Sequence, residues 1–142
     1  MLKPKRLVNK NFLSSLDISK TEFLDILDLA INFKNKTLEI QFKDKVLGLI
    51  FDKSSTRTRV SFQVAMSRLG GTTIDLNPNS SQIGRGEPVK DTARVLSKYC
   101  DALAIRTFKQ SVIEEYAKWS TKPVINALTA VSYTHLTLPT NC

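Results

Sequence analysis

The strongest constraint on the fold is Val46–Phe51, a run of apolar residues and one glycine with no polar residue among them. A strand with one face in water would alternate apolar and polar residues, so an unbroken run predicts a strand buried on both faces of a parallel sheet. The run ends abruptly at Asp52, and a polar segment follows as far as Arg59. This pattern predicts a strand-to-helix connection at the carboxyl edge of the sheet, meaning the edge at which the strands end, where ligands bind in such folds.

Strand and helix patterns alternate along the rest of the chain. Three further strands are predicted at 71–76, 102–106 and 123–127. Four helices are predicted at 19–36, 58–69, 89–99 and 111–119, the first of which opens on a capping-box pattern at Ser19 and Glu22. Such alternation predicts a three-layer α/β domain in which a four-stranded parallel sheet is flanked by helices.

The first three predicted helices have apolar sides that we expect to face the core. In chain order, these sides are formed by Phe23, Ile26, Leu27, Ala30 and Ile31, by Val60, Phe62, Ala65, Met66 and Leu69, and by Ala93, Val95 and Leu96.

Length and composition exclude several classes of protein. The 142 residues suit one domain, and no apolar run approaches the roughly 20 residues that would span a bilayer, so we expect no membrane partner. The net charge of +8 is spread along the chain, which favours an anionic small molecule over a nucleic-acid partner. Cys100 and Cys142 have no metal-type spacing, so we expect reduced thiols in a cytoplasmic protein.

Two elements at the predicted carboxyl edge have the chemistry of a phosphate site. Ser55, Thr56, Arg57 and Thr58 lie at a helix N-terminus, where free amides and the helix dipole favour an anion and where hydroxyls and a guanidinium add donors. Arg106 ends another predicted strand and should face the same edge. Structural roles remain open at this point: a helix cap for Ser55 or Thr56, and a surface ion pair for Arg106.

The segment 77–87 is rich in Asn, Ser, Gly and Pro and is predicted to be a long exposed loop. Gln82 or Arg85 in this loop could close over a ligand. Neither a GxGxxG nor a GxxxxGK motif occurs, so the sequence gives no nucleotide-binding signature.

Several of these segments resemble one enzyme family. Phe51–Phe62, with the sequence FDKSSTRTRVSF, resembles the carbamoyl-phosphate signature of the aspartate and ornithine transcarbamoylase family. Ser81–Gly84, Lys90–Leu96 and Arg106 followed by Lys109 and Gln110 resemble the ornithine branch more than the aspartate branch. Asp101–Arg106 and Pro123–Thr129 fit as well, so the resemblance covers residues 10 to 129 in order.

The resemblance implies the fold of a transcarbamoylase N-terminal domain and transfer of the carbamoyl group from carbamoyl phosphate to the side-chain amine of L-ornithine. The products would be L-citrulline and phosphate in arginine biosynthesis, without a metal or organic cofactor. Arg57 and Arg106 are the implied catalytic residues, and Gln82 would come from a neighbouring subunit of a homotrimer. Arg59 would either orient the loop or have a wholly structural role. The implied carbamoyl-phosphate-binding residues are Ser55, Thr56, Arg57, Thr58, Gln82 and Arg106.

The resemblance stops at Thr129. The family continues with a His-Pro-x-Gln motif, whereas this chain has Tyr133 at the expected histidine and Leu136 at the expected glutamine. His135 is displaced by two residues, and we expect no catalytic role for it. We therefore expect residues 1–129 to form the carbamoyl-phosphate-binding domain and residues 130–142 to be an unrelated tail of artefactual origin. The ornithine-binding domain is expected to be absent and the chain alone to be inactive.

Two functions from other classes remain open on the sequence alone. A non-catalytic anion-binding domain would keep the phosphate pocket without turnover. A basic nucleic-acid-binding module would show salt-dependent binding, but the aromatic residues do not interleave with basic ones as a base-stacking surface requires. Within the transferase interpretation, the amine could also be aspartate, putrescine or acetylornithine.

Overall fold

The computed structural model describes residues 10–52 and 54–129. The predictions for residues 130–142, including Tyr133, His135 and Leu136, concern a segment outside the described residues. Short 3-10 turns are found at Ser15–Asp17 (η1), Pro78–Ser80 (η2) and Gln82–Arg85 (η3). The helices and strands, in chain order, are α1 Lys20–Lys34, β1 Val46–Phe51, α2 Thr56–Arg68, β2 Thr72–Leu76, α3 Val89–Tyr99, β3 Ala102–Arg106, α4 Gln110–Trp119 and β4 Val124–Asn126.

The four strands form one parallel sheet in the order β2-β1-β3-β4, which confirms the predicted fold class. β1 lies between β2 and β3, and the chain passes from β1 to β2 on one side and later to β3 on the other. The strand order therefore reverses between β1 and β3. In open parallel sheets a crevice forms at the carboxyl edge at such a point, and ligands bind there.

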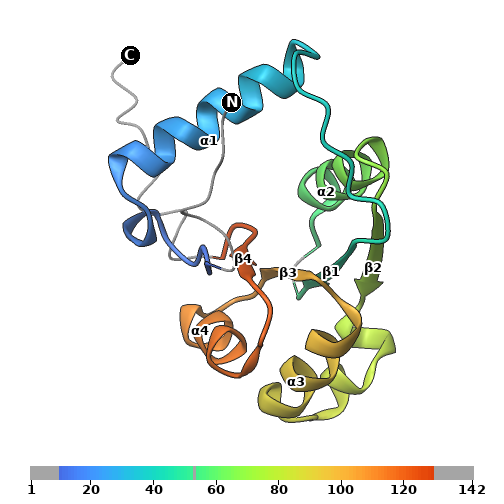
Figure 1. The fold of residues 1–142 in the computed structure, drawn as a ribbon. Helices are drawn as coiled ribbons and strands as arrows, with labels where there is room; N and C mark the ends of the chain where they lie inside the picture. The colour runs from blue at the N-terminus through green and yellow to red at the C-terminus, as the bar shows by residue number, and fades with distance from the viewer. Residues whose placement is uncertain (1–9, 53, 130–142) are drawn as a thin grey trace, which may run out of the picture.

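The sheet lies between two helical layers, with α2 over one face and α3 and α4 over the other (Figure 1). Because successive residues of a strand point to opposite faces, β1 contributes to two cores. Leu47, Leu49 and Phe51 pack with Met66 of α2, whereas Ile50 packs with residues of α3 and α4. The three-layer arrangement is thus confirmed.

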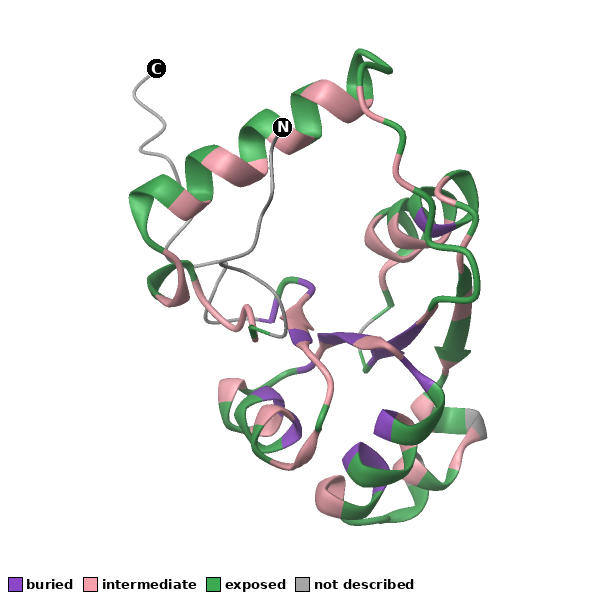
Figure 2. Cartoon of the chain, in the orientation of Figure 1, coloured by how far each residue is buried: buried purple, intermediate pink, exposed green. Residues whose placement is uncertain are grey.

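The prediction for the apolar side of the first helix is wrong. Figure 2 shows no buried residue on α1, and Phe23, Leu27 and Ile31 are 50%, 42% and 55% exposed. The helix forms because its sequence caps it well, but no other element covers its apolar side within the described chain. Periodicity predicts such a side and does not supply the surface that would bury it.

The buried sides of α2 and α3 also differ from the prediction. Val60 and Val95 are 47% and 51% exposed, and Ala65 is exposed. On α3, Thr92 and Ser97 are buried beside Ala93 because their hydroxyls have partners: Thr92 donates to Glu87, and Ser97 donates to the Ala93 carbonyl. A satisfied hydroxyl can occupy a core position that periodicity assigns to an apolar residue.

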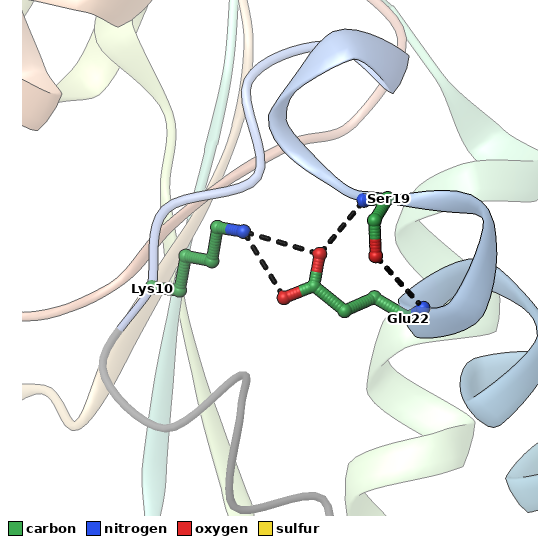
Figure 3. A network of polar contacts seen from close by, with 3 residues as sticks. All are labelled: Lys10, Ser19 and Glu22. Atoms are coloured by element: carbon green, nitrogen blue, oxygen red, sulfur yellow. Dashed lines mark hydrogen bonds and ion pairs between the residues drawn. The ribbon is translucent and has the colours of Figure 1, made fainter.

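The N-terminus of α1 is held by the predicted capping box (Figure 3). The Ser19 amide donates to Glu22 Oε2 at 2.7 Å, and the Glu22 amide donates to Ser19 Oγ at 3.2 Å. Lys10 Nζ lies 3.2 Å from Glu22 Oε1 and joins the network. These bonds, the Ser19 amide first and Lys10 next, lower the pKa of Glu22.

The N-terminal segment pairs with the last strand. The Phe12 amide donates to the Val124 carbonyl at 2.9 Å, and the Asn126 amide donates to the Phe12 carbonyl at 2.7 Å. The Asn126 side chain adds a bond to the Leu13 carbonyl. The outer edge of β4 is therefore occupied by residues from the opposite end of the described chain.

Within residues 10–52 and 54–129, no helix is both long and apolar enough to cross a membrane.

Candidate functional site

The start of α2 lies directly beyond the carboxyl end of β1. Ser55 is the residue before the helix, and its side chain makes no capping hydrogen bond to α2. Instead, Ser55 Oγ accepts a hydrogen bond from Arg106 Nη1 at 2.7 Å. The open structural role for Ser55, a helix cap, is thus not the one observed. The amides of the first turn, including those of Thr56, Arg57 and Thr58, have no acceptor within the helix.

Arg106 reaches this place from the neighbouring strand. It is the last residue of β3, and its register partner is Phe51, the last residue of β1. The two central strands thus bring Ser55 and Arg106 together at the point where the strand order reverses. The prediction that Arg106 faces the edge beyond β1 is confirmed by its contact with Ser55. Arg106 is half-buried, and its Nε is buried without a hydrogen-bond partner.

The charges around Ser55 and Arg106 favour the binding of an anion. Arg57 is exposed, and its guanidinium has no hydrogen-bond or ion-pair partner in the described part of the chain. The helix dipole of α2 adds positive potential at the same end. The nearby acid is Asp52, whose amide donates to the Arg106 carbonyl at 2.9 Å. Burial raises the pKa of the Asp52 carboxyl.

Gln82 and Arg85 lie on the segment that follows β2. Gln82 is the first residue of η3 and is exposed, as is Arg85. The Gln82 carbonyl accepts a bond from the Glu87 amide at 3.3 Å. No contact between Gln82 and Ser55–Thr58 or Arg106 is found among residues 10–52 and 54–129. The expectation that Gln82 acts from a neighbouring subunit stays a prediction.

Several buried polar atoms near the carboxyl edge lack a hydrogen-bond partner. In the described residues they are Arg59 Nε, Ser81 Oγ, Arg106 Nε and Gln110 Oε1. Each belongs to the end of a strand or to a segment that follows one. Arg59 Nε has the Asp75 carboxylate 3.2 Å away, but the other three atoms are unsatisfied. Unsatisfied buried polar atoms are rare in native proteins and call for an explanation such as a ligand or an ordered water.

Sequence reasoning missed the surroundings of Arg59. This side chain is ion-paired with Asp75 of β2, with Nε 3.2 Å from Oδ2, and it lies over the Phe51 ring. The sequence does not indicate that Asp75 pairs with Arg59, because this pairing depends on the register between β1 and β2. The available signal was the four-residue spacing from Ser55 to Arg59, which places Arg59 one helical turn after Ser55 and on the same side of the helix.

A hollow of about 910 Å³ is lined by residues other than those of this site. It is mostly apolar and contains none of Ser55–Thr58 or Arg106. Its walls come from the N-terminal segment, the starts of α1 and α4, and the end of β4. They comprise Phe12, Leu13, Ser14, Ser15, Leu16, Ile18, Ser19, Lys20, Phe23, Gln110, Glu114, Asn126 and Leu128.

The described residues hold no group of three or more His, Cys, Asp or Glu side chains that could bind a metal ion. The amides at the start of α2 and the guanidinium groups of Arg57 and Arg106 are donors, which suit a phosphate.

Residues 10–137 match the family described as aspartate/ornithine carbamoyltransferase, carbamoyl-P binding domain. The chain belongs to this family. The family match runs past Thr129, so the boundary expected there stays a proposal.

Relatives within the family are named as ornithine carbamoyltransferases. The enzyme of Prochlorococcus marinus subsp. pastoris is 74% identical over 133 residues, which make up 94% of this chain and 43% of the relative. The crystal structure of ornithine carbamoyltransferase from Gloeobacter violaceus matches with a TM-score of 0.77 and 49% identity, over 86% of this chain and 39% of that chain. This member of the carbamoyltransferase family thus spans less than half the length of these relatives.

The fold extends to the aspartate branch of the family. Aspartate transcarbamoylase from Trypanosoma cruzi, in complex with N-(phosphonacetyl)-L-aspartic acid, matches with a TM-score of 0.79 and 31% identity. The match covers 91% of this chain and 43% of that chain. The fold is thus shared with solved structures of both ornithine and aspartate enzymes.

Proposed function

We propose that this chain provides the carbamoyl phosphate site of an ornithine carbamoyltransferase. The observation that supports it best is the 2.7 Å bond between Arg106 and Ser55, which joins the ends of the two central strands beside the start of α2. In the proposed reaction, the side-chain amine of L-ornithine attacks the carbonyl carbon of carbamoyl phosphate, and L-citrulline and phosphate are formed.

The proposed roles follow from the charge that develops during this reaction. Ser55, Thr56, Arg57 and Thr58 would bind the phosphate through amides, hydroxyls and one guanidinium. Arg106 would contact both the phosphate and the carbonyl oxygen. Fixed donors at these positions stabilise the oxyanion of the tetrahedral intermediate and the departing phosphate, so catalysis is electrostatic and needs no covalent intermediate with the protein.

Ornithine is favoured over other amines by similarity. The relative that is 74% identical is named an ornithine carbamoyltransferase. We propose the same amine here, a role in cytoplasmic arginine biosynthesis and a homotrimeric full-length enzyme in which Gln82 reaches the site of a neighbour. The ornithine-binding residues would lie in the portion of the relatives that this chain does not match.

The phosphate site is tested by calorimetric titration of the purified chain with carbamoyl phosphate. We expect saturable binding, and we expect Arg57→Ala to weaken it at least about tenfold, because one charge-assisted contact contributes roughly 1.5–3 kcal/mol. Arg68→Ala is a suitable control, since it removes an exposed arginine from the last turn of α2, at the end of the helix opposite the proposed site. A folded wild-type chain that does not bind would contradict the proposed site.

The proposal that ornithine binds outside the part of the relatives matched by this chain gives a separate prediction. With carbamoyl phosphate and ornithine supplied together, the 142-residue chain is expected to form no citrulline above the uncatalysed rate, because the groups proposed to hold the amine lie in the portion of the relatives that this chain does not match. A colorimetric citrulline assay measures this, with a full-length relative as the positive control. Clear turnover by the chain alone would refute the proposal that ornithine binds elsewhere.

A further inference from the structure

One side chain in the first turn of α2 reaches two strands at once. Arg59 Nε lies 3.2 Å from Asp75 Oδ2, and the guanidinium carbon of Arg59 lies 5.5 Å from the centre of the Phe51 ring. Phe51 is the last residue of β1, and Asp75 is the residue before the last of β2. Arg59 therefore links the start of the helix to the carboxyl ends of both strands.

The register of the sheet explains why Asp75 faces α2. Its register partner is Leu49, which belongs to the core that contains Phe51 and Met66. Register partners on adjacent strands point to the same face of a sheet. The Asp75 carboxylate thus projects from the face covered by α2, beside apolar side chains, and a cation from α2 neutralises it there.

Few other contacts fix the first turn of α2. Met66, near the far end, is the buried residue of this helix, and Phe62 in the middle is partly buried against the same core. Val60 and Val64 are 47% and 41% exposed. Ser55 does not cap the helix, because its hydroxyl accepts the bond from Arg106. Packing consequently holds the second half of α2 more firmly than its start, and the contacts of Arg59 restrain that start.

We propose that Arg59 is a positioning residue for carbamoyl phosphate binding, held in place by Asp75 and Phe51. By fixing the first turn of α2, it keeps the amides of Thr56–Thr58 and the side chain of Arg57 directed at the phosphate. Arg59 acts through this turn, since its own guanidinium is engaged by the carboxylate and the ring. This inference rests on the proposed carbamoyl phosphate site.

The first test compares binding with stability. Asp75→Asn and Arg59→Met each break the ion pair, and we expect each to raise the Kd for carbamoyl phosphate about fivefold or more in calorimetry. The thermal midpoint should change little, because a partly exposed ion pair contributes little to stability. Arg59→Lys keeps the charge and should restore part of the affinity.

The matched control is the Lys45–Asp101 ion pair, with 3.0 Å between Nζ and Oδ1. Lys45 precedes β1 and Asp101 precedes β3, so this pair lies at the opposite edge of the sheet. Lys45→Gln should cost as little stability as Asp75→Asn and should leave the Kd for carbamoyl phosphate unchanged. An equal rise in Kd for Lys45→Gln would show a general effect of charge loss and would overturn the positioning role.

A second readout needs no ligand. Amide hydrogen exchange followed by NMR should become several-fold faster at Arg59–Ser61 in Asp75→Asn, while exchange in β1 and β3 stays unchanged. If the wild-type chain binds carbamoyl phosphate and the variants bind it equally well, the positioning role is wrong and the proposed function stands. If the wild-type chain does not bind, both proposals fail, and exchange still shows whether the ion pair orders the helix start.

Discussion

Arg106→Ala is expected to weaken carbamoyl phosphate binding by about two orders of magnitude. Two effects add. The variant loses the charge-assisted bonds that Arg106 is proposed to make to the ligand, each worth roughly 1.5–3 kcal/mol. It also releases Ser55, whose hydroxyl now accepts from Arg106 at 2.7 Å and would then be free to cap α2. A capping hydroxyl would occupy one of the amides that the phosphate needs.

The same variant should barely change the stability of the folded chain. Arg106 Nε is buried without a partner, so removal of this side chain also removes a desolvation cost. Calorimetry with carbamoyl phosphate and thermal unfolding, measured side by side, separate the two quantities. Arg106→Lys is the matched variant: it keeps the charge but lacks the planar fork, so an intermediate affinity is expected. An unchanged Kd in Arg106→Ala would contradict the proposed role.

Leu103→Ala is expected to cost about 3 kcal/mol of the free energy of unfolding, a large part of the stability of a domain this size. Leu103 is fully buried in β3, and it packs so closely on β1 that a Cβ added at Gly48 would lie 2.8 Å from its Cδ2. The surrounding strands cannot easily collapse into the space that the missing atoms leave. Urea unfolding should show a lower midpoint with an unchanged slope.

Leu24→Ala provides the matched comparison, because Leu24 lies on α1 and is 51% exposed. The same atoms are removed from a site in water, so the expected change is within about 0.5 kcal/mol. Equal losses in the two variants would mean that Leu103 does not occupy the tightly packed site described here.

The sequence predicted the strands well because buried parallel strands require continuous apolar runs. β1, α3 and β3 have the predicted bounds, whereas α2 and α4 begin earlier than predicted, at Thr56 and Gln110. The first residues of these two helices are polar, so a prediction from the apolar pattern places the start of each helix too late in the sequence. Boundaries set by capping and sheet geometry leave a weaker trace in a sequence than burial does.

The sides of the helices were harder to predict. Val95 fits the helical period of α3, yet it is 51% exposed, and Thr92 takes a buried place because Glu87 accepts its hydrogen bond. Whether a side is buried depends on which element covers it, and that is a property of the assembled fold. The apolar side of α1 makes the same point, since its residues are periodic and uncovered.

At the site, the sequence predicted that Arg106 faces the same edge of the sheet as Ser55–Thr58, but it missed the ion pair that depends on strand register. Arg106 meets Ser55 because both follow the carboxyl ends of neighbouring strands, which is a general rule of such sheets. Arg59 meets Asp75 because β1 and β2 pair with Leu49 opposite Asp75. A shift by one residue would turn Asp75 to the other face.

The pairing of the N-terminal segment with β4 also sets an order in time. Asn11 and Val124, which share a hydrogen bond, are separated by 113 residues, as are Leu13 and Asn126. At a synthesis rate of about 5–20 residues per second, roughly 6–20 seconds pass between the appearance of the two partners. Residues 11–13 leave the ribosome early, yet their pairing with β4 cannot form until residues 124–126 have been synthesised. The outer edge of β4 is therefore covered only when residues made early in synthesis pair with residues made more than a hundred positions later.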